Sequence, residues 1–316
     1  MKVCFVTANY PPEAHGGTEQ VVVALAKELV ARGLEVAAIS GSDVRRDEVG
    51  ADLIQDQREG VAVTRIFRTE DETDQQGFER PRVLALVRAR LIALRPHVVH
   101  VHSFAGLSLG VSAICRDLQI PVVVTFHDMW VTCARYFRVP AAGATCPTDA
   151  DHAACVACVN ESLQSDPELV RQAIARRDEL LRQELAFASA CTAPSRTAAD
   201  LVRGCVPYDK GIEVVPHGLL RPVALDHIAP PAQVGEPVRV GTFGGLVASK
   251  GLRELVDACA QVASQGGALE LQGPPPFLGA AAVPLLPRTY DAEEGGGAQG
   301  EGAGVGRESA SGRGFR

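Results

Sequence analysis

Apolar residues alternate between short unbroken runs and longer helical stripes over residues 1–225. Residues 3–7 form a continuous apolar run, which is typical of a parallel strand buried on both faces. Residues 18–32 then place apolar side chains at helical spacing, and Gly33 ends the stripe. The same order recurs with strands expected at 36–40, 61–67, 98–102 and 121–126 and helices at 81–94 and 107–116. This alternation predicts an α/β domain with a doubly wound, Rossmann-like parallel sheet.

A cysteine-bearing loop at 133–165 interrupts the alternation. A polar amphipathic helix follows at 167–188, and short strands are expected at 191–193 and 214–215. Ser195 stands where a helix N-cap is expected. The first domain is therefore predicted to span residues 1–225.

A second, smaller alternation follows a proline-containing linker at 226–237. One strand–helix–strand unit is expected within 238–273, which is too little to form a complete core. Residues 274–316 are mostly Gly, Ala, Pro, Arg and Glu, and they cannot bury enough apolar area to offset chain entropy. Two interpretations stay open: a disordered tail, or out-of-frame translation of a GC-rich coding sequence.

Composition and charge exclude several classes of protein. Apolar residues make up 46% and charged residues 22% of the chain, as in ordinary globular proteins. The net charge of −7 argues against binding to nucleic acid, which normally requires a basic surface. No segment has the apolar length of a transmembrane helix or a signal peptide, although peripheral membrane contact is compatible with the sequence. We expect a cytoplasmic protein with reduced cysteines.

Six short motifs, in the same order along residues 1–273, resemble those of family-4 glycosyltransferases. They are residues 3–7 with Gly16-Gly17-Thr18-Glu19, residues 98–102, Thr125-Phe126-His127-Asp128, Ala193-Pro194-Ser195, residues 214–218, and Phe243-Gly244-Gly245-Leu246 leading to Lys250-Gly251. The resemblance implies the GT-B fold of two Rossmann-like domains. It also implies retaining transfer of a sugar from a nucleotide-diphosphate donor to a carbohydrate or lipid-linked acceptor, without a metal required at the catalytic centre.

The chemistry of such a transfer requires groups that stabilise a departing diphosphate. Gly16 and Gly17 would let the backbone approach a phosphate or sugar at a helix N-terminus, although a plain βα turn would look the same. By the resemblance, Glu19 belongs to this donor and acceptor site, as do Gly244 and Gly245. Lys250 precedes a helix N-terminus, where its ammonium and the helix dipole would act on the same diphosphate.

Histidines stand at the ends of two expected strands. His127 ends a buried strand at the carboxyl edge of the sheet, where open α/β sheets bind ligands. By the resemblance it faces the donor sugar and contributes to catalysis, with Asp128 beside it. His100 and His102 alternate on one strand and point the same way, so His102 either lines the cleft or has a hydrogen-bonded core role.

The sequence departs from the family pattern in its second domain. An arginine is expected near Gly244-Gly245 and is missing, so Lys250 would act alone. Glu293 and Glu301 have the spacing of the family's donor-binding glutamates, but they lie in the glycine-rich tail and are interpreted as a coincidence. The donor-binding domain therefore reads as truncated, and we expect this chain to transfer sugar weakly or not at all.

The sequence also bears on two other classes of function. A non-catalytic module that binds the acceptor, or that pairs with a chain supplying the missing half, is compatible with an intact first domain. A nicotinamide-dependent oxidoreductase is disfavoured because Asn9-Tyr10-Pro11-Pro12 follows the first strand in place of Gly-x-Gly-x-x-Gly.

Four of the nine cysteines, Cys133, Cys146, Cys155 and Cys158, occur within 26 residues and end in Cys-x2-Cys. Such a cluster fits a structural zinc site, with His152 as a possible replacement for one ligand, but free thiols or disulfides fit it as well. The other five, Cys4, Cys115, Cys191, Cys205 and Cys259, lie in strand or helix patterns and are expected to be small core residues.

Overall fold

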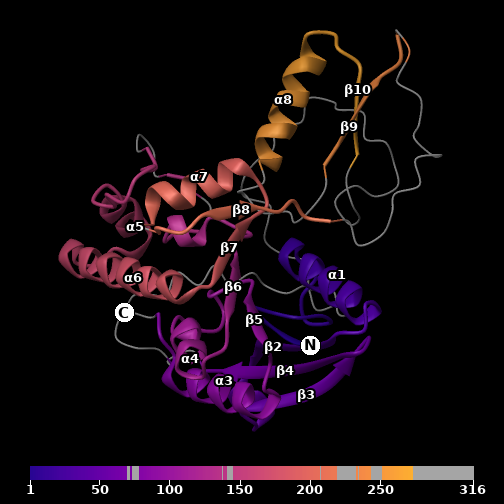
Figure 1. The fold of residues 1–316 in the computed structure, drawn as a ribbon. Helices are drawn as coiled ribbons and strands as arrows, with labels where there is room; N and C mark the ends of the chain where they lie inside the picture. Colours follow the sequence, from indigo (N-terminus) through magenta and orange to yellow (C-terminus); the bar gives the residue numbers. More distant parts are fainter. Residues whose placement is uncertain are drawn as a thin grey trace. The chain divides into compact units, whose positions relative to one another are not determined.

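The computed structural model describes residues 1–69, 72, 78–136, 138–140, 145–206, 208–218, 233, 235–242 and 251–272 (Figure 1). The chain divides into two compact units. The described residues up to 218 belong to the first unit, and those from 233 to 272 belong to the second. Most of the expected linker and the whole expected tail, 274–316, lie outside the described residues.

The first unit is built on an eight-stranded sheet in the order β3-β4-β2-β1-β5-β6-β7-β8. The strands are β1 (Lys2–Thr7), β2 (Glu35–Arg45), β3 (Leu53–Arg58), β4 (Val61–Arg68), β5 (Val98–Val101), β6 (Val122–Thr125), β7 (Ala190–Ala193) and β8 (Ile212–Val214). Every neighbouring pair is parallel except β3 and β4, which are antiparallel. The α/β class is confirmed.

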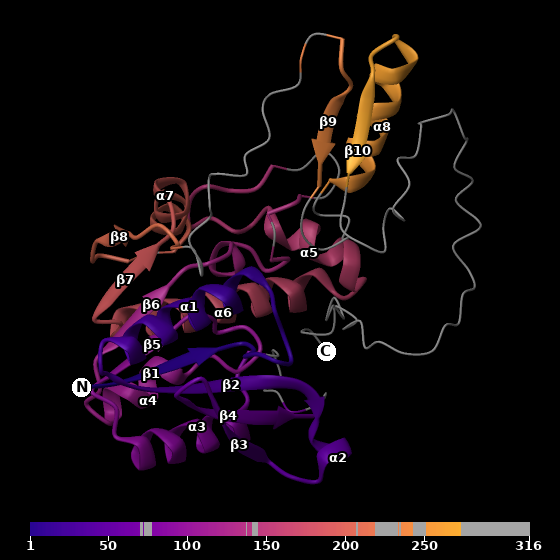
Figure 2. The same cartoon turned by 90° about the vertical axis from the view of Figure 1, so that its right-hand side faces the viewer.

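Helices cover both faces of this sheet (Figures 1 and 2). Their bounds are α1 (Gly17–Ala31), α2 (Arg46–Val49), α3 (Pro81–Leu94), α4 (Val111–Asp117), the short 3₁₀ helix η1 (Trp130–Thr132), α5 (Cys155–Leu163), α6 (Pro167–Phe187) and α7 (Arg196–Cys205). Side chains alternate along β1: Phe5 packs in the core with α1, whereas Val6 packs in the core with α3, α4 and α6. Burial on both faces explains the unbroken apolar run of β1.

Most of the expected elements of the first unit are confirmed within a few residues, and the differences have local causes. The sheet is not wholly parallel, because β3 pairs antiparallel with β4. The sequence analysis missed β3, whose mostly exposed positions carry a weak apolar signal. It also missed α2 and α5, the latter lying inside the expected cysteine loop. Helix α4 begins later than predicted because Gly110 adopts a left-handed backbone with φ of 108° just before it.

The second unit, as far as it is described, is the predicted strand–helix–strand unit. Strand β9 (Val238–Gly241) pairs in parallel with β10 (Leu269–Gln272), and α8 (Leu252–Ser264) connects them. Gly251, with φ of 71°, precedes the helix.

All five cysteines outside the clustered segment are buried, as predicted. In the part of the chain that the structure describes, no helix combines the length and the hydropathy needed to cross a membrane.

Candidate active site

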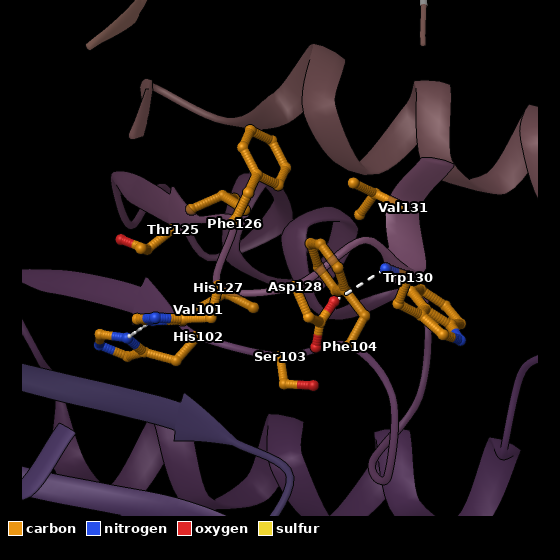
Figure 3. A pocket seen from close by; sticks show the side chains of 11 residues that line it. Val101, His102, Ser103, Phe104, Thr125, Phe126, His127, Asp128, Trp130 and Val131 are labelled. Atoms are coloured by element: carbon orange, nitrogen blue, oxygen red, sulfur yellow. Dashed lines mark hydrogen bonds between the residues drawn. The ribbon is translucent and has the colours of Figure 1, made fainter. Parts of the chain in front are cut away.

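The candidate site lies where β5 and β6 end side by side at the carboxyl edge of the sheet. A small pocket of about 20 Å³ opens there, which is room for a water molecule. Its walls come from residues 101–104 after β5 and from residues 124–128 with Trp130 and Val131 after β6 (Figure 3). Parallel pairing explains this meeting, because it brings the carboxyl ends of adjacent strands to one edge.

A row of histidines crosses this edge. His102 Nδ1 lies 2.7 Å from His127 Nε2, and His127 Nδ1 lies 3.3 Å from His217 Nε2. The ring centroids of His100 and His102 are 4.0 Å apart, as their alternation on β5 predicted. His100 is hydrogen-bonded through Nε2 to Thr125 Oγ1 at 2.7 Å. The row runs from buried His102 to exposed His217.

Burial keeps the inner histidines neutral. It lowers the pKa of His100 to about 4. The pKa of His127 is also lowered to about 4, mainly by burial and in part by the positive charges that His217 and His100 would carry. The pKa of His102 lies well below its usual value, mainly because the ring is buried. At neutral pH these three rings therefore act as neutral hydrogen-bonding groups.

The hydrogen bonds of the row have a preferred direction. His102 Nε2 is buried and has no hydrogen-bond partner among the described residues. An orphaned N–H is costlier than an orphaned lone pair, so we assign the proton of His102 to Nδ1, which donates to His127 Nε2. His127 then carries its own proton on Nδ1 and donates toward exposed His217. The donor atom of His127 thus points to the open side of the site.

Asp128 is held by the segment that follows it. Its carboxylate accepts from the backbone N–H of Trp130 at 2.8 Å, visible in Figure 3, and from the hydroxyl of Tyr136. The side chain of Ser103 lies beside the Tyr136 hydroxyl, and its own hydroxyl donates to the carbonyl oxygen of Ala105 at 3.2 Å. Burial raises the pKa of Asp128. Asp128 is therefore a pre-oriented carboxylate beside His127.

The start of α1 reaches the same region. Gly16 is the N-cap residue, and the carboxylate of Glu19 accepts from its backbone N–H, as the third helical residue does in a capping box. Burial raises the pKa of Glu19, and the negative charge of Glu19 helps to raise the pKa of Tyr136. A Cβ on Gly17 would meet no atom within 4 Å, so packing against the described chain does not explain this glycine. The open space at Gly17 fits the close approach of a ligand.

Two arginines of β4 fix the loops at this edge, and the sequence analysis missed both. Arg65, 2% exposed, donates to the carbonyl oxygens of Tyr10 and Pro11 at 2.6 and 2.5 Å. Arg68 donates to Ser42 O at 2.6 Å and to Gly106 O. The apolar pattern of β4 gave no sign that its arginines donate hydrogen bonds to the carbonyl oxygens of loops.

The structure brings together four of the predicted residues: His102, His127 and Asp128, with Glu19 near them through Tyr136. Gly244, Gly245 and Lys250 lie outside the described residues. Sequence reasoning missed Tyr136 and Ser103 and assigned His217 no place in the site. A signal existed for His217 alone, since it follows a strand expected to end at the same edge.

The clustered cysteines Cys133, Cys146, Cys155 and Cys158 are free thiols. Among the residues described, no group of three or more His, Cys, Asp or Glu side chains stands in a position to hold a metal ion. The zinc site therefore stays a prediction.

Solved structures share the fold. Two structures of OtsA, one described as apo and one as trehalose-6-phosphate synthase, superpose with TM-scores of 0.53 and 0.55 at 15% identity and cover 86% of this chain. A third, from E. coli and described as bound with UDP-2-fluoro glucose, has a TM-score of 0.50 at 14% identity, with 89% of this chain and 66% of that chain covered. The chain spans less than two thirds of the first two, 65% and 64% of their lengths. These similarities show the GT-B fold.

The search of curated proteins found no match to the sequence. The sequence profile of Glycosyltransferase Family 4 matches residues 15–219, about two thirds of the chain. This range contains α1 and every strand of the sheet except β1, and it includes His102, His127, Asp128 and His217. The chain belongs to glycosyltransferase family 4.

Proposed function

We propose that this protein acts on a nucleotide-diphosphate sugar and that its first unit binds the acceptor, a carbohydrate or a lipid-linked sugar. The observation that carries the proposal is the neutral His127, whose Nδ1 faces the open side of the strand edge. A neutral imidazole N–H can bind a sugar hydroxyl without opposing a cationic, oxocarbenium-like transition state. Family membership supports the reaction class, and retention follows from the resemblance.

His127 would form its sugar contact by exchanging partners. Its bond to His102 is short and buried, whereas its contact with exposed His217 is 3.3 Å long. A sugar hydroxyl can therefore replace His217 at Nδ1 while His102 keeps the ring in place. Asp128, already bound by Trp130 and Tyr136, would orient a second hydroxyl.

The departing diphosphate would be stabilised by backbone and lysine groups, so that no metal is required at the catalytic centre. The first N–H groups of α1, at Gly17 and Thr18, have no acceptor inside the helix, which suits them to an anion. By the resemblance, Gly244, Gly245 and Lys250 belong to the donor side, where Lys250 would meet the diphosphate.

We further propose that the 316-residue chain alone turns over weakly. Its second unit, within the described residues, offers two strands and one helix, which is a small platform for a nucleotide. A non-catalytic module that binds the acceptor, or that depends on a partner chain, is the alternative.

The test incubates the full chain with nucleoside-diphosphate sugars, with and without simple sugar acceptors, and measures release of the nucleoside diphosphate. We expect slow release that falls about 10²–10⁴-fold in His127→Ala, because a positioned acid–base or hydrogen-bonding group is lost. His97→Ala, an exposed histidine before β5, is the matched control.

Three results would change the proposal. Release that His127→Ala leaves unaltered contradicts the role of His127. Acceptor binding by calorimetry with no release at all favours the non-catalytic module. Fast turnover by the unmodified chain contradicts weak activity.

A further inference from the structure

A second pocket lies away from the histidine row, between the segment after η1 and helix α5. All four clustered cysteines, Cys133, Cys146, Cys155 and Cys158, line it, and we call it the cysteine pocket. Its volume is about 20 Å³. Cys155 and Cys158 are three residues apart on α5, so their side chains lie on one face of the helix.

The four thiols are close enough to affect one another. The pKa of Cys155 is raised to about 11, mainly by burial and in part by the charges that Cys133, Cys158 and Cys146 would carry. Burial also raises the pKa of Cys146, with Cys133 and Cys158 adding to the effect. All four thiols therefore belong to one group of side chains around one pocket.

Positive charge surrounds the cysteine pocket. Arg177 on α6 is 2% exposed. Its guanidinium lies close enough to Cys133 and Cys155 to interact electrostatically with their thiolates. Its carboxylate partner is Asp178, at 3.3 Å, and its Nε has no hydrogen-bond partner among the residues described. Arg135 Nη1 lies 3.4 Å from Cys158 Sγ, and the charge of Arg138 is felt at Cys146. A buried guanidinium that is only partly compensated calls for further negative charge nearby.

We propose that Cys133, Cys146, Cys155 and Cys158 bind one structural Zn²⁺ as thiolates. Each thiol gives up its proton to solvent and forms a sulfur–zinc bond, with no change of oxidation state. Four thiolates and one Zn²⁺ leave two net negative charges, which the guanidinium groups of Arg135, Arg138 and Arg177 are placed to balance. Among the described residues the four sulfurs are not arranged to hold a metal ion, so the proposal requires their side chains to rearrange when zinc binds.

The zinc would stabilise the segment that holds the candidate active site. Cys133 directly follows η1, and Tyr136, which donates to Asp128, lies between Cys133 and Cys146. Arg177 also donates to the carbonyl oxygen of Trp130 and stacks on its ring. Zinc binding in the cysteine pocket would therefore hold Tyr136 in position to donate to Asp128. The metal site itself does not depend on the proposed transfer reaction.

His152 is the competing ligand. Its Nδ1 lies 2.6 Å from Asp178 Oδ2, and its Nε2 is buried without a hydrogen-bond partner in the described chain. A metal-binding histidine commonly has such a carboxylate on its other nitrogen. His152 does not line the cysteine pocket, which is why we assign the four thiols.

The test measures metal in the full-length chain purified under reducing conditions. We expect about one zinc per chain by elemental analysis after expression with zinc. After chelation, Co²⁺ should give the absorption of a tetrahedral site with strong sulfur-to-metal charge transfer, and proton release should accompany binding. No bound zinc and no cobalt spectrum would overturn the proposal. Loss of hydrogen in the intact mass, showing disulfides among these cysteines under reducing purification, would overturn it as well.

Variants assign the ligands. Cys158→Ser should reduce zinc affinity at least about tenfold, whereas Cys259→Ala, a buried cysteine of α8, should leave it unchanged. His152→Ala should leave the cobalt spectrum unchanged, and a weaker charge-transfer spectrum with an altered d–d band would overturn the four-thiolate assignment. If Cys158→Ser does not fold, the zinc content and cobalt spectrum of the unmodified chain still decide.

Discussion

The histidine row and the cysteine pocket are organised by different forces. In the row, the backbone register of β5 and β6 places His100, His102 and His127, and the rings stay neutral because they are buried. In the cysteine segment, side-chain contacts take the place of backbone pairing: Arg135 binds Cys158 O, Arg138 contacts Cys205 Sγ, and Arg177 binds Trp130 O. The sheet edge is therefore positioned by backbone pairing, whereas the cysteine segment depends on charged side-chain contacts.

The largest expected effect comes from removing one of the charged side-chain contacts of the cysteine segment. Arg177→Ala removes the donor to Trp130 O, the cation over the Trp130 ring and the partner of Asp178. We expect a loss of about 3–5 kcal/mol in the free energy of unfolding, because a buried ion pair and its packing are lost together. Urea denaturation followed by fluorescence of Trp130 measures it.

A surface arginine of the same helix provides the control. Arg171 is 60% exposed and pairs with Glu168, so Arg171→Ala should cost about 0–1 kcal/mol. If the free energy of unfolding falls equally little in both variants, charged contacts do not stabilise the cysteine segment. The contrast between the two regions would then be wrong.

The fold and the strand-edge part of the site were predictable for the same reason. Apolar runs located β1, β5 and β6, and position at a strand end then selected His127 and Asp128. Tyr136 and Arg177 were not predictable, because their partners lie across loops and no periodicity reports such a contact. The edge strand β3 was missed since most of its positions are exposed and show no regular apolar pattern.

The next largest effect concerns the histidine row and is measured as the pH dependence of the free energy of unfolding. Burial lowers the pKa of His100 from 6.5 to about 4, so below pH 6.5 the unfolded chain takes up a proton that the folded chain does not. Stability should therefore fall as the pH drops from 6.5 to 4, by about 3 kcal/mol from this group. His100→Gln keeps a partner for Thr125 and should reduce that slope, to which the lowered pKa values of His102 and His127 also contribute, as measured by denaturation at a series of pH values.

His97→Gln, at an exposed histidine before the same strand, is the comparison for that experiment. An unchanged slope in His100→Gln would show that His100 is not the group that resists protonation.

The smallest effect tests the link between the two regions. Tyr136→Phe removes the hydroxyl that donates to Asp128, and we expect a loss of about 1.5–3 kcal/mol, as for a hydrogen bond to a charged group. A double-mutant cycle with Asp128→Asn measures the coupling, and a coupling energy of zero would mean that the cysteine segment and the strand edge are independent.

The antiparallel strand β3 has a consequence for self-association. It occupies one edge of the sheet, and the exposed positions along it include Gln55, Gln57 and Arg58. Without β3, the apolar strand β4 would present unpaired backbone groups to any other chain. A variant without residues 53–58 should therefore precipitate by edge-to-edge pairing, even though no residue of the candidate site would have changed.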